Sequence, residues 1–416
     1  MKVLVIGNGG REHALVRSLA DDPEVSAIWC APGNGGTSAL ATNITVDAND
    51  PSAVSALAVS LGIDLVIVGP EAPLVAGVAD AVREAGIACF GPSGPAAQLE
   101  GSKAFAKEIM AAADVPTAMA HVCTTAEEAA AALDQFGAPY VVKNDGLAAG
   151  KGVVVTDDRG IALAHAAACE SVVIEEFLDG PEVSLFAITD GVTALALTPA
   201  QDFKRIGDDD LGPNTGGMGA YTPLPWAPAD LVDDVLTRVV QPTLEEMQRR
   251  GTPFSGLLYV GLALTSRGMR VVEFNARFGD PETQAVLARL RTPLGQLLMS
   301  AATGHLDTQP DLAWIDGSAV TVVLAAPGYP DTPITGGTIT GIESAEEVEG
   351  VRVLHAGTRI TDEGTLVSSG GRVLSVTAIA DTLIDARAGA YEAMVRIRLD
   401  GGQYRTDIAS KAIVTA

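Results

Sequence analysis

The chain has 416 residues, 47% hydrophobic and 19% charged, and its 52 acidic residues against 27 basic ones give a net charge of −25. This composition predicts a folded protein of two to four domains and excludes an intrinsically disordered chain. It also excludes nucleic acid as a partner, because no cluster of Lys and Arg supplies the basic surface that nucleic acid requires.

The cysteines and the uncharged stretches bear on location. Neither a disulfide framework nor a zinc site is expected, because the cysteines are widely separated and include no C-x-x-C pair. The longest uncharged stretch, Val25–Val46, is rich in Gly, Ser, Thr and Asn, which is not the composition of a membrane span. We therefore expect a cytoplasmic protein with no membrane partner.

The first hundred residues alternate short apolar runs with helical patterns. The run VLVIG precedes a predicted helix at 12–19, and DLVIVGP precedes one at 75–85, after which IACFGPS follows. Continuous Val, Ile and Leu runs between helices are typical of a parallel sheet that is covered on both faces. We predict an open parallel α/β domain over residues 1–101 that binds substrate.

The turn after the first strand, GNGGREH, resembles a dinucleotide-binding turn but departs from it. That fingerprint requires glycine where the chain has Glu12, which weakens the case for a dehydrogenase. The amides of Gly9 and Gly10 could still bind an anion at the helix N-terminus, and a purely structural turn is the alternative. Glu71 follows a later strand, where ligands bind in open α/β sheets, and suits a hydroxyl or an amine.

From about residue 102 the pattern changes to closely spaced strands. A predicted helix at 103–113 precedes the stretch TTAEEAAAALDQFG, which begins with a capping box of Thr125 and Glu128 and ends at Gly137. The strands YVVK, GVVVTD, SVVIEEF, EVSLFAIT and TALALTP follow, and their short connections are typical of antiparallel sheet.

The remaining elements define two further domains. A helix at 231–249 and strands at 256–265 and 269–278 complete a predicted α+β domain over 102–311. The proline-bearing stretch TQPDLAWIDG is the predicted linker. The rest of the chain is rich in strands, with one helix at 385–396, and predicts a C-terminal α+β domain over 317–416.

The stretch KNDGLAAGKGVVV places three glycines between two apolar runs. It is not a Walker A loop, because only three residues separate Gly146 from Gly150 and Lys151, and Gly152 stands where Ser or Thr is needed. We predict a hairpin whose amides approach phosphate oxygens, with Lys143 adding positive charge. A tight hairpin without a ligand is the alternative.

The stretch VVEFNARFGDPETQ predicts a strand with two different faces. Alternation places Glu273, Asn275 and Arg277 on one side and three apolar side chains on the other. Carboxylate and amide oxygens suit Mg²⁺ that bridges phosphates, and the arginine could bind a carboxylate or a transferring phosphoryl group. A surface strand with its polar face in water is the alternative.

Other charged and titratable residues are predicted to have no catalytic role. The acidic runs DDD at Asp208–Asp210 and EEVE at 346–349 are interpreted as solvated faces. The five histidines are scattered along the chain, so each is interpreted as structural, with His13 the most open to a functional role because it follows the first glycine turn.

Taken together, these motifs resemble those of ATP-grasp enzymes and, within that superfamily, the phosphoribosylamine–glycine ligase family. The stretches that carry the resemblance occur in the family's order along nearly the whole chain: VLVIGNGGREHAL, APGNGGT, IVGPEAPL, AQLEGSKAFAK, DGLAAGKGV, IEEFLDGPE, GPNTGGMGAY, EFNARFGDPETQ, HAGT and GGRVL. The resemblance implies that ATP activates glycine as glycyl phosphate, which 5-phosphoribosylamine then attacks to give glycinamide ribonucleotide.

The resemblance also implies that residues 102–311 form an ATP-grasp domain of two α+β subdomains, one of them a lid at about 115–180, and it implies roles for individual residues. Lys103 and Lys143 would hold the ATP phosphates, the latter also neutralising charge in the reaction, and the loop from Gly146 to Gly152, with Gly150 and Lys151, would close over them. Glu182 would bind the ribose. The backbone that recognises adenine would be Glu175, Glu176, Phe177 and Leu178.

At the reacting end, Glu273 and Asn275 would bind Mg²⁺ or Mn²⁺. Gly9, Gly10 and Glu71 would bind phosphoribosylamine. The remaining residues would line the reacting centre, with Arg277 as a catalytic residue: Asp202, Lys204, Asn214, Thr215, Gly216, Gly217, Met218, Gly219 and Arg277.

One departure and several alternatives accompany this interpretation. The segment Ala166–Ser171 is shorter than the family's usual glycine-containing segment, which questions how the lid covers the nucleotide. A biotin-dependent carboxylase subunit shares the loop and the metal strand, and a regulatory nucleotide-binding module without turnover is a second alternative. We expect a monomer, with a dimer as the alternative.

Overall fold

The computed structural model describes residues 1–147 and 152–415. Its first unit is a parallel sheet with strand order β3-β2-β1-β4-β5. Its strands are β1 (Lys2–Gly7), β2 (Ala27–Pro32), β3 (Thr42–Asn43), β4 (Leu65–Val68) and β5 (Ala88–Phe90). Its helical segments are α1 (Gly10–Ala20), η1 (Thr37–Ala39), α2 (Pro51–Leu61), α3 (Glu71–Val75) and α4 (Val78–Glu84). The open parallel sheet predicted from the sequence is confirmed.

The helix predicted at 75–85 is wrong in its bounds. Two helices, α3 and α4, stand in its place, because Gly77 between them has φ +87° and interrupts the helical backbone. Such a left-handed conformation costs glycine little and other residues more.

The predicted lid is an antiparallel sheet with strand order β6-β9-β7-β8. Its strands are β6 (Ala120–Cys123), β7 (Tyr140–Asn144), β8 (Val153–Thr156) and β9 (Val172–Glu175), and its helices are α7 (Ala126–Phe136) and α8 (Arg159–Ala167). The capping box that begins α7 is confirmed, because Thr125 and Glu128 each bind the other's backbone N–H at 3.2 Å. The helices α5 (Gln98–Gly101) and α6 (Lys103–Ala112) lead into this unit.

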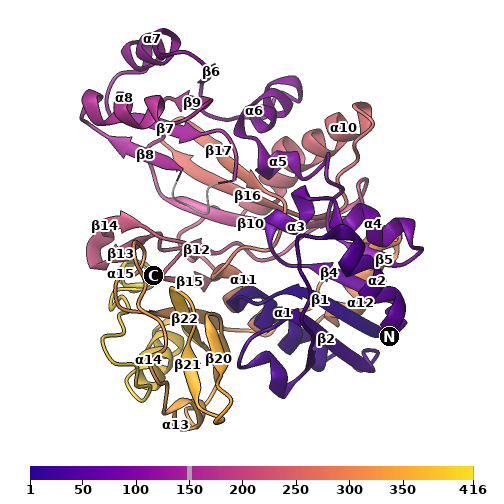
Figure 1. The fold of residues 1–416 in the computed structure, drawn as a ribbon. Helices are drawn as coiled ribbons and strands as arrows, with labels where there is room; N and C mark the ends of the chain where they lie inside the picture. The colour runs from indigo at the N-terminus through magenta and orange to yellow at the C-terminus, as the bar shows by residue number, and fades with distance from the viewer. Residues whose placement is uncertain (148–151, 416) are drawn as a thin grey trace.

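A larger antiparallel sheet, β11-β10-β16-β17, lies between the lid and the other two units (Figure 1). Its strands are β10 (Glu182–Thr189), β11 (Ala194–Ala196), β16 (Gly256–Thr265) and β17 (Gly268–Asn275). The accompanying helical segments are α9 (Leu231–Val235), η3 (Leu236–Val240), α10 (Gln241–Arg249), α11 (Glu282–Arg289), α12 (Leu294–Ala302) and η4 (Leu306–Thr308). The predicted helix at 231–249 is therefore present, but a π-helical turn interrupts it just before Pro242, which lacks a backbone donor.

The C-terminal sheet has the order β12-β15-β18-β22-β19 and takes two of its strands from the middle of the chain. The two from the middle of the chain are β12 (Gln201–Asp202) and β15 (Gly219–Thr222). The others are β18 (Ser318–Ala325), β19 (Val351–His355) and β22 (Arg372–Ala380). Shorter pairs and helical segments complete the unit: β13 (Arg205–Gly207), η2 (Asp208–Asp210), β14 (Leu211–Asn214), α13 (Ile342–Glu346), β20 (Thr358–Ile360), β21 (Leu366–Ser368), α14 (Leu383–Met394) and α15 (Ser410–Thr415). This sheet crosses the predicted boundary at 317, and the domain bounds stay predictions.

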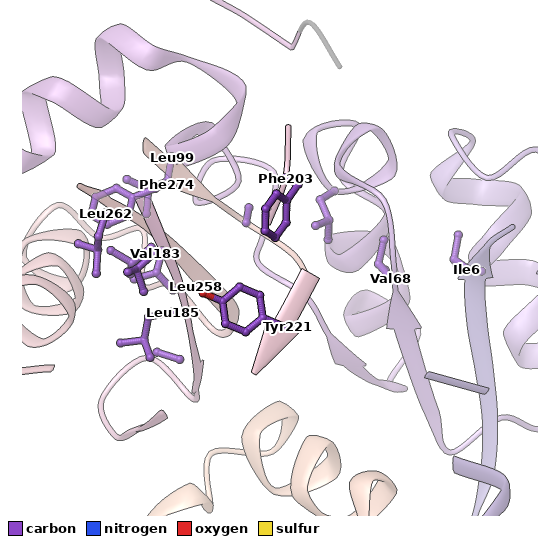
Figure 2. Packing of buried hydrophobic residues seen from close by; sticks show 14 of the residues in the cluster. Ile6, Val68, Leu99, Val183, Leu185, Phe203, Tyr221, Leu258, Leu262 and Phe274 are labelled. Carbon is purple, nitrogen blue, oxygen red and sulfur yellow. The ribbon is translucent and has the colours of Figure 1, made fainter. Parts of the chain in front are cut away.

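One hydrophobic core extends from the parallel sheet into the large antiparallel sheet. Ile6 and Val68 belong to the same buried cluster as Leu258 and Phe274, and Tyr221 of the C-terminal sheet packs in it as well (Figure 2). The units therefore pack as neighbours around shared apolar contacts. None of the helices described here is long and apolar enough to cross a membrane.

A buried polar contact joins the first unit to the C-terminal sheet. The backbone N–H of His355 donates to His13 Nδ1 at 2.8 Å, and His355 Nδ1 lies 3.0 Å from Thr358 Oγ1. Both histidine side chains are buried between α1 and the C-terminal unit. This position agrees with the predicted structural role of His13.

Candidate active site

A β-bulge in β17 determines which side chains leave the core. Leu262 pairs with Val271, but the next residue of β16, Gly261, pairs with Glu273, so Val272 is an extra residue. Bulges of this kind reverse the alternation of the residues that follow. Odd-numbered residues are buried before the bulge and even-numbered residues after it, and Glu273 and Asn275 therefore lie outside the apolar core.

Glu273 lies among cationic side chains from separate segments of the chain. Burial alone would raise the pKa of its carboxyl group. The nearby positive charges lower that pKa by more than burial raises it, so the pKa lies below its usual value; these charges belong to Lys204, Lys143, Lys103 and Arg277. The carboxylate is therefore ionised at neutral pH and able to ligate a hard cation.

Lys143 is buried beside the bulge. Its Nζ donates to the carbonyl of Val272 at 3.1 Å and pairs with Glu175 Oε2 at 2.9 Å. Glu175 also pairs with Lys107 Nζ at 3.1 Å, on the other carboxylate oxygen. Sequence reasoning missed Lys107, although it lies one helical turn after Lys103 on α6, a spacing that could have revealed it.

The strands that flank the predicted glycine hairpin pair as the prediction requires. Strands β7 and β8 pair in antiparallel fashion with Lys143 opposite Val153, and the N–H of Asn144 donates to the carbonyl of Gly152 at 2.7 Å. Lys103 Nζ donates to the carbonyl of Gly146 at 3.0 Å, which places this lysine at the start of the loop. Gly150 and Lys151 lie outside the described residues.

The predicted hinge connects the lid to the large sheet. The N–H of Glu176 donates to the carbonyl of Met119 at 3.0 Å, and its carboxylate pairs with Arg267 at 2.8 Å. Phe177 is exposed and Leu178 is half-buried, between the end of β9 and the start of β10. A backbone segment in this position joins two sheets, as the expected nucleotide hinge requires.

Arg277 joins the metal strand to the first unit. Its guanidinium lies 3.2 Å from Glu71 Oε2, 2.7 Å from Glu100 Oε1 and 3.4 Å from Asn275 Oδ1. Burial opposes the charged form of Arg277, but these carboxylates outweigh it and raise its pKa. Glu71 and Arg277, predicted from separate motifs, are therefore in contact. Glu100 lies in the stretch AQLEGSKAFAK but was given no role, because its partner Arg277 lies 177 residues away in the chain.

The N-terminus of α1 is bound by the chain's own carboxylates. The N–H of Gly9 donates to Glu12 Oε2 at 2.5 Å, and the N–H of Arg11 donates to Asp280 Oδ2 at 3.3 Å. A Cβ atom on Gly10 would lie 2.6 Å from the side-chain nitrogen of Gln284, so any larger residue at this position would displace that side chain. Substrate binding by Gly9 and Gly10 stays a prediction.

Asp202 and Lys204 lie at the start of the candidate substrate loop. Burial raises the pKa of Asp202 to about 7 against the opposing charge of Lys204, whose Nζ pairs with Glu182. The N–H of Thr215 donates to the carbonyl of Lys204 at 2.7 Å.

The rest of the loop is held by packing and backbone bonds. Met218 is fully buried, and its N–H donates to the carbonyl of Phe203 at 2.8 Å. Asn214 ends β14 and Gly219 begins β15, while Gly216 and Gly217 form the turn between them. Gly217 has φ +113°, and a Cβ there would lie 2.4 Å from Pro281.

The run Asp208–Asp210 reaches solvent, as interpreted, but two of its carboxylates also bind the C-terminal segment. Asp208 accepts a hydrogen bond from the N–H of Thr406 at 2.7 Å, and Asp210 pairs with Arg405 at 2.9 Å. Arg405 has a fully buried side chain, and such a cation requires carboxylate partners. The run therefore anchors the C-terminal segment.

The donor set fits a metal held jointly with phosphates. Within the described part of the chain, no cluster of three or more His, Cys, Asp or Glu side chains could hold a metal by itself. Glu273 and Asn275 offer a carboxylate and an amide oxygen, and Mg²⁺ is commonly held by one or two protein ligands together with substrate phosphates.

Comparison with known families matches three parts of the chain to phosphoribosylglycinamide synthetase models. Residues 1–100 match the N domain, 101–283 the ATP-grasp (A) domain and 319–411 the C domain. The phosphoribosylamine–glycine ligase of Streptomyces coelicolor is 66% identical over 99% of both chains. That of Mycobacterium bovis is 57% identical over 99% of this chain and 98% of its own.

Solved structures give the same result for the fold. The crystal structure of a phosphoribosylamine–glycine ligase from Thermotoga maritima matches with a TM-score of 0.86 and 32% identity, over 98% of this chain and 100% of that one. The biotin carboxylase domain of the Hydrogenobacter thermophilus 2-oxoglutarate carboxylase matches with a TM-score of 0.72 and 17% identity, over 97% and 91%. The second likeness concerns the fold alone.

Proposed function

The chain belongs to the phosphoribosylglycinamide synthetase family, so it is an ATP-dependent ligase of purine biosynthesis, and we propose that it joins glycine to 5-phosphoribosylamine through glycyl phosphate at the site around Glu273. One observation carries this assignment of the site: Lys143 Nζ lies 3.1 Å from the carbonyl before Glu273 and Arg277 lies 3.4 Å from Asn275 Oδ1, and the charges of these two residues, with those of Lys103 and Lys204, lower the pKa of Glu273. Such a concentration of positive charge suits a triphosphate and a carboxylate that react beside a metal-ligating acid.

The first step is phosphoryl transfer. A carboxylate oxygen of glycine attacks the γ-phosphorus of ATP, a new P–O bond forms, and the bond to ADP breaks. The protein contributes in-line positioning and charge neutralisation, and no protein nucleophile is required. We assign Lys103 and Lys143 to the phosphates as positive charges, with amides supplied by the loop between β7 and β8, and we assign Arg277 to the acyl phosphate.

The second step is acyl transfer. The amine nitrogen of 5-phosphoribosylamine attacks the carbonyl carbon of glycyl phosphate, the C–N bond forms, the C–O bond to phosphate breaks, and the amine loses a proton. We assign the acceptor side to Gly9, Gly10 and Glu71. Arg277 contacts Glu71 and so joins this side to β17, the strand that bears Glu273 and Asn275. Asp202, Lys204 and the Asn214–Gly219 loop complete the reacting centre.

The nucleotide end of the site follows from the hinge. Glu175, Glu176, Phe177 and Leu178 would present backbone to adenine, and Glu182 would bind the ribose once Lys204 turns toward substrate. Family membership implies ATP and a divalent metal, and we propose Mg²⁺ or Mn²⁺ held by Glu273 and Asn275. The metal would neutralise negative charge on the phosphates.

A coupled ADP assay tests this function. ADP release should require glycine and freshly prepared 5-phosphoribosylamine together, and mass spectrometry should detect glycinamide ribonucleotide. Bicarbonate in place of glycine tests the carboxylase alternative, since the carboxylase fold is shared. ADP release with bicarbonate in place of glycine, or in the absence of both glycine and 5-phosphoribosylamine, would overturn the assignment.

Two properties of the whole molecule complete the proposal. We propose that the enzyme acts in the cytoplasm and as a monomer. Light scattering of the purified chain at micromolar concentration should give the monomer mass of 42.5 kDa, and a mass near twice that value would establish the dimer.

A further inference from the structure

The turn of the candidate substrate loop is held by side chains from the C-terminal unit. Arg372, the first residue of β22, donates from Nη1 to the carbonyl of Gly216 at 2.5 Å. The N–H of the same glycine donates to Tyr329 Oη at 2.9 Å. Both backbone polar groups of Gly216 are therefore bonded by side chains that lie more than a hundred residues away in the sequence.

The same arginine nitrogen also reaches the segment that follows the metal strand. Nη1 of Arg372 donates to the carbonyl of Asp280 at 2.6 Å, and the carboxylate of Asp280 lies 3.4 Å away. One side chain thus ties the Gly216 turn to Asp280, which itself bonds the start of α1 through the N–H of Arg11. Two segments that the proposed reaction needs together therefore meet at Arg372, and Asp280 extends the link to the start of α1.

The fit between the loop and the arginine is close. A Cβ on Gly216 would lie 3.0 Å from Cζ of Arg372, and a Cβ on Gly217 would lie 2.4 Å from Pro281. Two glycines in succession therefore allow the loop to lie against the guanidinium and the 280–281 segment. Nη1 bridges the two carbonyls through N–H bonds whose directions the plane of the guanidinium fixes, whereas the N–H bonds of a lysine rotate.

We propose that Arg372 is a positioning residue for the acyl-transfer step: it holds the Gly216–Gly217 turn against Asp280, so that the acceptor amine meets the acyl phosphate in a fixed geometry. This inference rests on the proposed function, in which the Asn214–Gly219 loop belongs to the reacting centre. Because Arg372 touches the loop and Asp280 rather than the nucleotide elements, its loss affects the acceptor and leaves ATP binding intact.

Steady-state kinetics of Arg372→Met and Arg372→Lys test the inference. We expect Arg372→Met to lower kcat about 10²-fold, as misplacement of reacting groups does, and to raise the KM of phosphoribosylamine while the KM of ATP stays within about twofold. Arg372→Lys should recover part of kcat. The matched control is Arg398→Lys, because Arg398 also donates to carbonyls, those of Val395 and Ile397 in its own unit.

Hydrogen exchange gives a readout that does not depend on turnover. Peptides covering residues 211–219 should exchange faster in Arg372→Met and, to a smaller extent, in Tyr329→Phe, while peptides of β16 stay unchanged. If Arg372→Met does not fold, Arg372→Lys and Tyr329→Phe decide the question by the same measurements.

The outcomes separate this inference from the proposed function. Unchanged kcat and exchange in the Arg372 variants, or a parallel loss of ATP affinity and thermal stability, would overturn the positioning role. A wild-type enzyme that makes no glycinamide ribonucleotide would instead overturn the proposed function, whatever the exchange shows.

Discussion

At the scale of single residues, charge compensation explains how an acidic protein assembles an anion-binding site. The net charge of −25 repels phosphates, so the site depends on local cations around one carboxylate. Lys143 illustrates the arrangement: Glu175 offsets the cost of burying its ammonium, and the Val272 carbonyl fixes its position. The lysine is therefore oriented before substrate binds.

Glu273→Gln tests the metal-ligating role. The amide keeps the shape of the side chain but removes the charge that a divalent cation requires. We expect kcat to fall by about 10²-fold or more, the scale of losing one electrostatic contact to the transition state, with the thermal midpoint little changed. The exposed Glu349→Gln serves as control. A near wild-type rate in Glu273→Gln would argue against metal binding here.

Arg277→Ala tests the link between the metal strand and Glu71. Removal of the guanidinium leaves Glu100 buried without its partner, which should cost roughly 3–5 kcal/mol of unfolding free energy. The double variant Arg277→Ala/Glu100→Gln should recover part of that stability in urea unfolding.

The kinetic effect of Arg277→Ala should not be rescued with the stability. We expect kcat to remain low in both Arg277 variants, and the KM of ATP to change less than kcat. A loss confined to ATP affinity would show that Arg277 serves the nucleotide instead of the acyl phosphate.

At the scale of elements, sequence patterns predicted more of the fold than of the contacts. The alternation over Glu273, Asn275 and Arg277 was visible because each residue type differs from its neighbours. The bulge at Val272 could not be predicted, because no feature of the sequence distinguishes an unpaired valine in a strand from a paired one. Glu100, Arg372 and Asp280 were not assigned roles because their partners lie more than ninety residues away in the chain.

Deletion of Val272 tests the importance of the bulge. Without the extra residue, Glu273 follows Val271 directly, and regular alternation still keeps Glu273 and Asn275 outside the apolar core. The deletion does remove the Val272 carbonyl that binds Lys143 Nζ at 3.1 Å, so this buried lysine loses its fixed position, and we expect a lower free energy of unfolding and slower ADP formation. Val272→Ala keeps the bulge and the carbonyl that binds Lys143, and it should retain most of the activity. Equal activity of the deletion variant would contradict this account.

At the scale of the whole molecule, contacts between units rest on buried polar groups as well as on the shared core. Burial lowers the pKa of His13 to about 3 and that of His355 to about 4. Unfolded histidines have a pKa near 6.5, so the unfolded chain binds protons that the folded chain does not. Stability from these two residues is full above pH 6.5 and is lost as pH falls toward 4.

His13→Asn should weaken this acid sensitivity. Within that window each histidine lowers the free energy of unfolding by about 1.4 kcal/mol for each pH unit of acidification. Removing one histidine should therefore reduce the slope of the unfolding free energy against pH by about that amount. Urea unfolding between pH 7 and pH 4.5 measures the slope. The exposed His305→Asn is the control and should keep the wild-type slope. An unchanged slope in His13→Asn would mean that the buried pair does not control acid stability.

The C-terminal sheet, with β12 and β15 drawn from the middle of the chain, has a consequence for dissecting the enzyme. A gene cut at the linker before β18 would strip β15 of its inner neighbour and leave an apolar strand edge open to other chains, a known route to aggregation. Neither fragment would then be a self-sufficient module. Co-expressed halves should become soluble together, through re-formation of the β15–β18 ladder, and insoluble apart.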